Sequence, residues 1–298
     1  MTDRSGAPVV VGVDGSPSAL DAVRVAAREA ATRHRPLRVV HAFIWPLFGT
    51  PLGPVPFAPP DAGFRHEAEK LVAEAVDEAR KTASEIEVTG EVVEGAATPV
   101  LRSESRDAAL LVLGHRGLGG FAELLVGSTA VHVTSHADCP VLVVRAEPRA
   151  DGPVVVGVDG SAVSTEAVGF AFAEAAQRGT DLVAVHAWLY PTPMGPGDIA
   201  PLVYDPELLK VEEKRMLAES LAGWSERYPD VPVRHRLVAG PAAQVLAEES
   251  RHAQLTVVGA QGRGAFTGML LGSVSHALLH HAHSPLAIVR HRRNGHAS

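Results

Sequence analysis

The chain of 298 residues contains a single cysteine, Cys139, so no disulfide bond can form within it. Chains with few cysteines are typical of reducing compartments. The first residues also lack the apolar core of a secretory signal, and no stretch approaches the ~18 consecutive apolar residues of a transmembrane helix. We therefore expect a soluble, cytoplasmic protein that does not associate with a membrane.

Positive charge is scarce as well. Lys and Arg together number 27 against 34 Asp and Glu, which gives a formal net charge of −7 and a pI near 6.1. Proteins that follow the phosphates of a nucleic acid normally carry a basic excess or a basic stripe. The sequence therefore argues against a nucleic-acid partner.

Hydrophobic residues are plentiful, at 46% of the chain, and the length is about twice the roughly 150 residues of one domain. Apolar, β-branched runs alternate with amphipathic stretches, which predicts an α/β fold with a parallel sheet built by crossover connections. In the first half we expect strands at 9–13, 37–42, 88–94, 109–113 and 141–144, and helices at 18–33, 65–85, 98–106 and 128–135. A polar linker at 146–152 predicts domains at 1–146 and 147–298.

The second half repeats the landmarks of the first at a constant distance. Asp159 follows Asp14 by 145 residues, and the same interval separates the histidines that end the second strands, His41 and His186. No net insertion separates these landmarks, so the chain contains two copies of one α/β unit. The period is a domain length and is too long for a solenoid.

Each half carries a glycine pattern behind an apolar run, in the form Gly-x2-Gly-x9-Gly-Ser. The pattern comprises Gly114, Gly117, Gly127 and Ser128 in the first half and Gly259, Gly262, Gly272 and Ser273 in the second. A strand that ends on glycine, a glycine-rich loop and a helix that opens on Gly-Ser place unpaired backbone N–H groups around a small cavity, which suits a phosphate. Glycine is expected because a Cβ would obstruct phosphate oxygens and because such loops visit positive φ.

The strand-terminal Asp14, the glycine pattern and the closing strand at 140–144 follow the order of the universal stress protein family, which each half resembles. The whole chain is similar to tandem members of the ATP-binding type, common in actinobacteria. The resemblance implies two doubly wound, Rossmann-like domains, each with a five-stranded parallel sheet of order 3-2-1-4-5 and helices on both faces. It also implies that the closing strands of the two domains pair antiparallel within the chain, and we expect a homodimer of chains.

In an open parallel sheet, ligands bind beyond the carboxyl ends of the strands where the strand order reverses, here between the first and fourth strands. The resemblance assigns Asp14 to the adenosine part of ATP and Leu113 to the base. The backbone beside Gly12 and Ala42 would form the wall around it. The ribose and phosphates are assigned to Gly114, Gly117, Gly127, Ser128 and Thr129. The matching positions of the second half are Gly157, Asp159, Ala187, Val258, Gly259, Gly262, Gly272, Ser273 and Val274.

The two glycine loops differ in their charged residues. The first loop carries Arg116 between its first two glycines, and the second carries Arg263 one step past Gly262. Because an acidic protein needs local positive charge to hold a triphosphate, we expect each loop to use its own arginine. The first loop also holds Glu123 where the second has Gly268, and we predict that the two sites differ in affinity.

Three functions are open on these grounds: a nucleotide-binding sensor in a stress response, a slow ATPase or nucleotidyl transferase, and a scaffold with vestigial sites. The sequence has no Gly-x4-Gly-Lys-Ser/Thr loop and no Gly-x-Ser-x-Gly elbow, which argues against the enzymes built on those motifs. Asp14 and Asp159 are candidates to hold a Mg²⁺ ion or to orient water, but a lone carboxylate is a meagre catalytic set. We therefore assign no catalytic residue.

Two further features have plainer alternatives. The loops at 45–60 and 188–201 contain prolines and aromatics, so they are candidates for lids or a partner surface, or are ordinary surface loops. His132 and His136 stand one helical turn apart, as do His276 and His280, which is a metal-ligand spacing. The pairs lack a third ligand and do not match between the repeats. We therefore predict ordinary helix histidines and no metal site.

Overall fold

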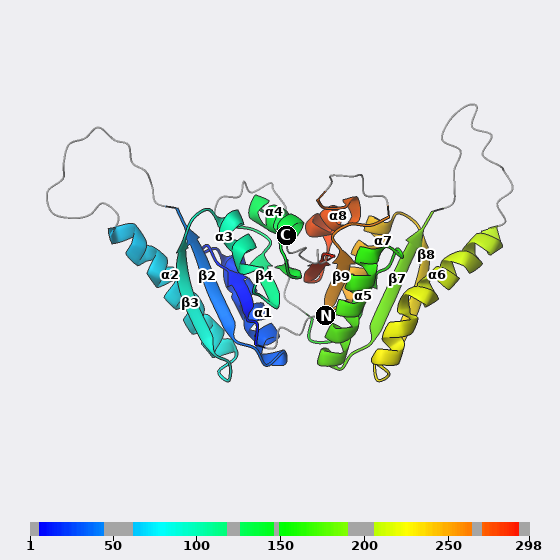
Figure 1. Ribbon diagram of the computed structural model, residues 1–298, viewed down its shortest axis with the longest axis horizontal. Coiled ribbons are helices and arrows are strands. Elements are labelled where there is room, and N and C mark those ends of the chain that lie inside the picture. Colours follow the sequence, from blue (N-terminus) through cyan, green and yellow to red (C-terminus); the bar gives the residue numbers. More distant parts are fainter. Residues whose placement is uncertain are drawn as a thin grey trace, which may run out of the picture. The chain divides into compact units, whose positions relative to one another are not determined.

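The computed structural model describes residues 6–44, 62–117, 126–145, 149–189, 206–263 and 270–291. The chain divides into two compact units, Met1–Arg145 and Ala146–Ser298, and each is described by itself (Figure 1). Both units alternate strands and helices around a parallel sheet, so the predicted α/β class is confirmed. Among these residues no helix is both long and apolar enough to cross a lipid bilayer.

The sheet of unit 1 has five parallel strands in the order β3-β2-β1-β4-β5. The strands are β1 (Val9–Gly12), β2 (Leu37–Phe43), β3 (Val88–Glu94), β4 (Leu110–Gly114) and β5 (Val141–Val144). In the register, Val11 of β1 stands opposite Val39 of β2 and Val112 of β4. The order reverses between β1 and β4, so the carboxyl ends of these two strands lie side by side.

The central strand of unit 1 is buried on both faces. Val9, Val10 and Val11 are 0%, 1% and 0% exposed, although successive side chains of a strand point to opposite faces. Helices must therefore cover both sides of the sheet. This burial explains why the strand is a continuous apolar run and not an alternating one.

The helices of unit 1 form one layer on each face. They are α1 (Pro17–Thr32), α2 (Ala62–Thr82), α3 (Ala97–Glu104) and α4 (Ser128–His136). Right-handed crossovers that move in one direction along the sheet place α1 and α2 on one face, and the reversed direction places α3 and α4 on the other. The observed packing of α1 on α2 and of α3 on α4 agrees with this arrangement.

Unit 2 repeats the same plan, with strand order β8-β7-β6-β9-β10. Its strands are β6 (Val154–Gly157), β7 (Leu182–Trp188), β8 (Val233–Ala239), β9 (Leu255–Gly259) and β10 (Leu286–Val289). Its helices are α5 (Ala162–Arg178), α6 (Pro206–Arg227), α7 (Ala242–Glu249), the short 3₁₀ helix η1 (Ser250–His252) and α8 (Ser273–His281). The first helix of each unit begins at an equivalent cap, because the hydroxyl of Ser16 accepts from the Ala19 N–H and that of Ser161 from the Ser164 N–H.

The predicted element ends differ from the observed ones by up to three residues. The helix expected at 65–85 is α2 at Ala62–Thr82, and the one expected at 98–106 is α3 at Ala97–Glu104. After Glu104 the N–H groups of Arg106 and Asp107 donate to carbonyls three residues earlier, so a tight turn replaces the last part of the predicted helix.

Several predictions fall outside the described residues or concern how one unit meets the other. The loop expected at 45–60 and most of that at 188–201 lie outside the described ranges, as do Glu123 and Gly268. The pairing of the closing strands and the homodimer stay predictions.

Candidate functional site

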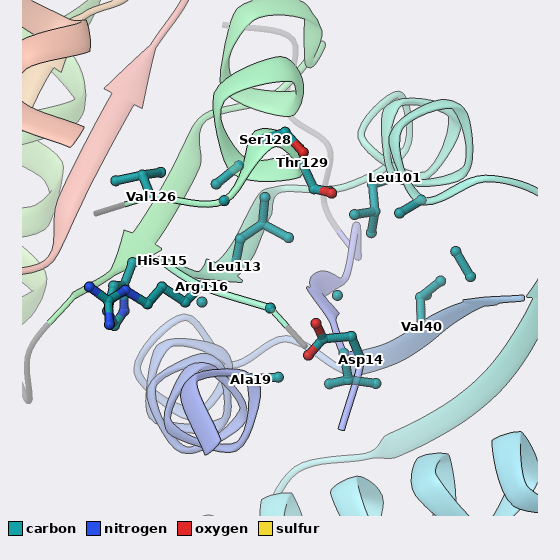
Figure 2. Close-up of a pocket in the computed structure, with 18 residues that line it drawn as sticks. Asp14, Ala19, Val40, Leu101, Leu113, His115, Arg116, Val126, Ser128 and Thr129 are labelled. Atoms are coloured by element: carbon teal, nitrogen blue, oxygen red, sulfur yellow. The ribbon is translucent and has the colours of Figure 1, made fainter. Parts of the chain in front are cut away.

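A pocket of about 300 Å³ opens at the carboxyl ends of β1 and β4 in unit 1, where the strand order reverses (Figure 2). Ligands of open parallel sheets bind at this place. Every residue predicted for the first half lines the pocket: Gly12, Asp14, Ala42, Leu113, Gly114, Arg116, Gly117, Gly127, Ser128 and Thr129.

The equivalent pocket of unit 2 measures about 330 Å³. Every residue predicted for the second half lines it: Gly157, Asp159, Ala187, Val258, Gly259, Gly262, Arg263, Gly272, Ser273 and Val274. Both volumes fall at the lower end of the range of small-molecule sites, roughly 300–1,000 Å³. The two pockets are therefore copies of one site.

In each unit, the aspartate that follows the first strand accepts hydrogen bonds from backbone N–H groups beside the pocket. In unit 1, Oδ1 of Asp14 accepts the N–H of Ser16 at 3.0 Å across a turn in which Gly15 has φ of 86°. In unit 2, Oδ1 of Asp159 accepts the N–H of Ser161 at 2.9 Å, and Oδ2 accepts the N–H of Arg263 at 2.9 Å. The carboxylate of Asp159 thus bonds to the strand-ending turn and to the glycine loop.

The glycines of the loop are needed for close approach, not for an unusual backbone. The expectation of positive φ is wrong for Gly114 and Gly117, since neither is among the described glycines with positive φ. A Cβ on Gly117 would collide with Oδ2 of Asp14, and one on Gly114 would lie 2.6 Å from Oγ of Ser18. A Cβ on Gly262 would collide with Oδ2 of Asp159 in the same way. Each loop can reach the strand-ending turn only because these positions lack a side chain.

The helix behind the loop begins without a side-chain cap. Gly127 is the N-cap of α4 and Gly272 the N-cap of α8, and neither glycine has a side chain that could cap the helix start. The N–H of Gly127 donates to the carbonyl of His115 at 2.8 Å, and that of Gly272 to Ala260 at 2.7 Å, which holds the loop beneath the helix. The first N–H groups of each helix are therefore left for an anion, to which the helix dipole adds positive potential.

Apolar side chains that were missing from the sequence prediction form a wall of the same pocket. In unit 1 it is formed by Val40, Ala97 and Leu101, and in unit 2 the matching residues are Val185, Ala242 and Leu246. A Cβ on Gly12 would lie 2.9 Å from methyl groups of both Leu101 and Leu113, so this glycine gives the two leucines room. The 145-residue interval between the two sets was a signal that could have identified them.

The remaining lining residues were also not predicted. They are Val13, Ala19, His115, Val126 and Ala130 in unit 1, and Val158, Ser164, Gln261 and Ser275 in unit 2. Most of them are direct sequence neighbours of predicted residues. The chemically distinct one is His115.

Positive groups gather near the loop of unit 1. Nδ1 of His115 lies 3.1 Å from the carbonyl of Val144 and 3.1 Å from Oγ of Ser18. Burial lowers the pKa of His115, and the charges of Arg145 and Arg116 lower it further. Burial and the charge of Arg116 also lower the pKa of Arg145.

Metal ligands are sparse in both pockets. Within the described ranges, no group of three or more His, Cys, Asp or Glu side chains is placed to hold an ion. Each pocket has one lining carboxylate, Asp14 or Asp159. A divalent cation in either pocket would therefore be coordinated largely by oxygen atoms of the bound small molecule.

The sequence model of the universal stress protein family matches residues 7–145 and 152–290. The chain belongs to the universal stress protein family. A universal stress protein of Mycobacterium tuberculosis is 42% identical over 311 residues, which cover 95% of this chain and 94% of the relative. The resemblance predicted from the glycine pattern is thereby confirmed.

Solved structures also include members of this family. The crystal structure of a universal stress protein from Archaeoglobus fulgidus aligns with a TM-score of 0.69 and 16% identity, and the alignment covers 97% of this chain and 99% of that one. This likeness concerns the fold. A second aligned structure is a universal stress protein in complex with cAMP. This alignment covers 46% of the present chain and 94% of the cAMP-bound protein, with 29% identity and a TM-score of 0.35.

Proposed function

We propose that this universal stress protein binds ATP in both pockets and acts as a nucleotide-dependent regulator in a stress response. One observation carries the proposal: each unit joins an apolar wall to a glycine loop and an uncapped helix start within a single pocket. An apolar wall suits a purine base, and free N–H groups at a helix start suit phosphates.

Different residues of the first pocket would contact the base, the ribose and the phosphates of ATP. Leu101, Leu113 and Val40 would contact the base, and Asp14 would accept hydrogen bonds from the ribose hydroxyls. The backbone N–H groups of Ser128 and Thr129 would bind phosphate oxygens, in the positive potential of the start of α4. Gly117 would let the loop lie close to Asp14 without a side chain between them.

A regulatory role is a better fit for these pockets than rapid turnover. Phosphoryl transfer is catalysed mainly by metal ions, cations and a group that orients the nucleophile. Each pocket offers one carboxylate and no cluster of metal ligands among the described residues. Regulation requires that ATP bind one conformation or assembly better than another, and the tie between the strand-ending aspartate and the loop is the contact we expect ATP to change.

The first test measures what the purified protein carries. The protein is denatured, the released nucleotide is identified by chromatography, and ADP production is followed over hours with added ATP. We expect ATP, up to two per chain, with little ADP formed. Steady ADP production that disappears with the pocket variants described next would favour the enzyme, and the absence of both bound nucleotide and binding on titration would favour the scaffold.

Matched glycine variants show whether the assigned pockets are responsible. Gly117→Asp and Gly262→Asp each place a second carboxylate against Asp14 or Asp159, where steric overlap and like charge both oppose binding. Gly63→Asp and Gly223→Asp are controls, because a Cβ at either helix position meets nothing within 4 Å. We expect one nucleotide fewer per chain in each pocket variant and none lost in the controls. Unchanged occupancy in the double pocket variant would contradict the site assignment.

A further inference from the structure

The two pockets differ at three positions beside the glycine loop. Unit 1 has Ser18, His115 and Arg116, whereas the positions 145 residues later hold Val163, Ala260 and Gln261. The first set is polar or basic, and the second set is apolar or neutral. Because most of the other lining positions hold the same residue in both pockets, this difference concerns what each can bind.

The three residues of unit 1 form one hydrogen-bonded group. Oγ of Ser18 lies 3.1 Å from Nδ1 of His115 and accepts the N–H of Arg116 at 3.4 Å. Both loop residues line the pocket, and Figure 2 shows their side chains next to each other, away from Asp14. The carbonyl of His115 also receives the N–H of Gly127, the N-cap of α4. The backbone of His115 therefore contacts the helix start to which phosphates are assigned, and its ring packs against Ser18 and Val144.

The corresponding corner of unit 2 is neutral. A Cβ on Gly259 would lie 2.9 Å from Cγ1 of Val163, where one on Gly114 would lie 2.6 Å from Oγ of Ser18, so a methyl group replaces the hydroxyl that meets His115. Arg263 is the loop's arginine, but a Cβ on Gly160 would collide with its guanidinium. That guanidinium therefore lies over the turn after Asp159, at the end of the pocket where the ribose is expected.

Arginines after the closing strands do not remove this contrast. Arg145 in unit 1 and Arg290 in unit 2 occupy matching positions, and Nη1 of Arg290 donates to the carbonyl of Leu270 at 3.1 Å. One cation of this kind is present in each unit. The difference in fixed charge thus comes from Arg116, and His115 adds a ring that can take up a proton.

We propose that the two pockets select adenine nucleotides by their number of phosphates. The pocket of unit 1 prefers ATP to AMP strongly, because the charge of Arg116 attracts the additional phosphates and His115 can take up a proton beside them. The pocket of unit 2 binds ATP and AMP with similar affinity, because neutral residues stand at these positions. This specificity rests on the proposed function, and it would let one chain respond both to the level of ATP and to its ratio to AMP.

The test isolates each pocket in the full chain. Gly262→Asp leaves unit 1 to be measured, and Gly117→Asp leaves unit 2. Calorimetric titrations with ATP, ADP and AMP give the dissociation constants for each variant. We expect the preference for ATP over AMP to be at least tenfold larger in unit 1 than in unit 2, and to fall with added salt as expected for charge attraction. Equal preferences in the two pockets would overturn the inference and leave the proposed function intact.

Exchange of the loop residues tests the assigned side chains. In the background that reports on unit 1, His115→Ala with Arg116→Gln is expected to reduce the ATP-to-AMP preference about tenfold. The reverse exchange, Ala260→His with Gln261→Arg in the background that reports on unit 2, is expected to raise it. A gain of this kind cannot result from misfolding. If neither exchange alters the preference, the inference is wrong, and if no nucleotide binds either pocket, the proposed function fails with it.

Discussion

His115 is the side chain that most distinguishes the first pocket from the second. Burial and the neighbouring charges of Arg145 and Arg116 lower its pKa below the usual 6.5, while the carbonyl of Val144 and the charge of Asp21 act in the opposite direction. The neutral ring therefore predominates at neutral pH. Since Ala260 stands in its place in unit 2, only unit 1 can gain a positive charge at this position as the pH falls.

We expect bound ATP to raise the pKa of His115, because phosphate charge stabilises the protonated ring. By linkage, the contribution of this ring to ATP affinity increases as the pH falls through the pKa of the ATP-bound ring toward the lower pKa of the free protein. For folding of the protein without ligand the sign is reversed, since protonation of a partly buried ring costs stability as the pH falls from 6.5 toward the lowered pKa. The measurement is an NMR titration of the imidazole with and without ATP, assigned with His115→Ala. A pKa that ATP leaves unmoved would contradict the prediction.

The helices that cover the sheets are packed differently in the two units. Ala27, Ala79 and Ala83 of unit 1 correspond to Phe172, Trp224 and Tyr228 of unit 2, each 145 residues later. The rings of Phe172 and Tyr228 stack with centroids 5.9 Å apart. The same architecture is therefore built with small side chains in one unit and aromatic ones in the other.

Arg24 and the residue 145 positions later contact the neighbouring helix in different ways. In unit 1, Nε of Arg24 donates to Glu78 at 2.6 Å between α1 and α2. In unit 2 the matching residue is Gly169, and a Cβ there would collide with the ring of Trp224. An ion pair in one unit is replaced by aromatic packing in the other.

Loss of an aromatic ring should therefore affect unit 2 strongly. Phe172 is fully buried on α5, and Phe172→Ala is expected to lower the free energy of unfolding of this unit by about 3–5 kcal/mol, through lost burial and the cavity left behind. Leu208→Ala on α6 is the control, since Leu208 is 64% exposed and its loss should cost no more than about 0.5 kcal/mol. Urea unfolding followed by tryptophan fluorescence gives both values. Equal effects of the two substitutions would refute the packing argument.

The complete chain is a duplication in which each unit has its own sheet and its own pocket. The residues that line each pocket all come from a single unit. Ligand binding in one pocket can therefore be removed without changing the lining of the other. This arrangement allows a direct test with the intact chain.

Hydrogen exchange measured with ATP should report the two pockets separately. ATP is expected to slow exchange of the first amides of α4 and α8 in the unaltered protein, because phosphates would bind those N–H groups. In Gly117→Asp the protection of α4 should be lost and that of α8 retained, and Gly262→Asp should show the reverse. Gly63→Asp serves as the control that keeps both. Loss of both protections from one substitution would show that the pockets are not independent.

The architecture could be predicted because its signals are local and repeated. The apolar run at 141–144 is observed as β5, and the helix predicted at 18–33 is observed as α1 at Pro17–Thr32. Buried ion pairs could not be predicted in the same way. Glu29 and Glu174 occupy matching positions on helices and are 5% and 2% exposed, because each pairs with an arginine one turn later, Arg33 or Arg178. Their burial depends on the layers packed around the helix.

The order of strands and the spacing of glycines along the chain were enough to identify the family and to locate both pockets, since topology brings the ends of the first and fourth strands together. The apolar wall and the directions of the loop cations required the folded molecule. Leu101 meets Gly12 only after α3 packs on the sheet, and the N–H of Arg263 meets Asp159 across 104 residues of sequence. A side chain's direction, and the space that a missing Cβ leaves, depend on residues distant in the chain, which no local pattern records.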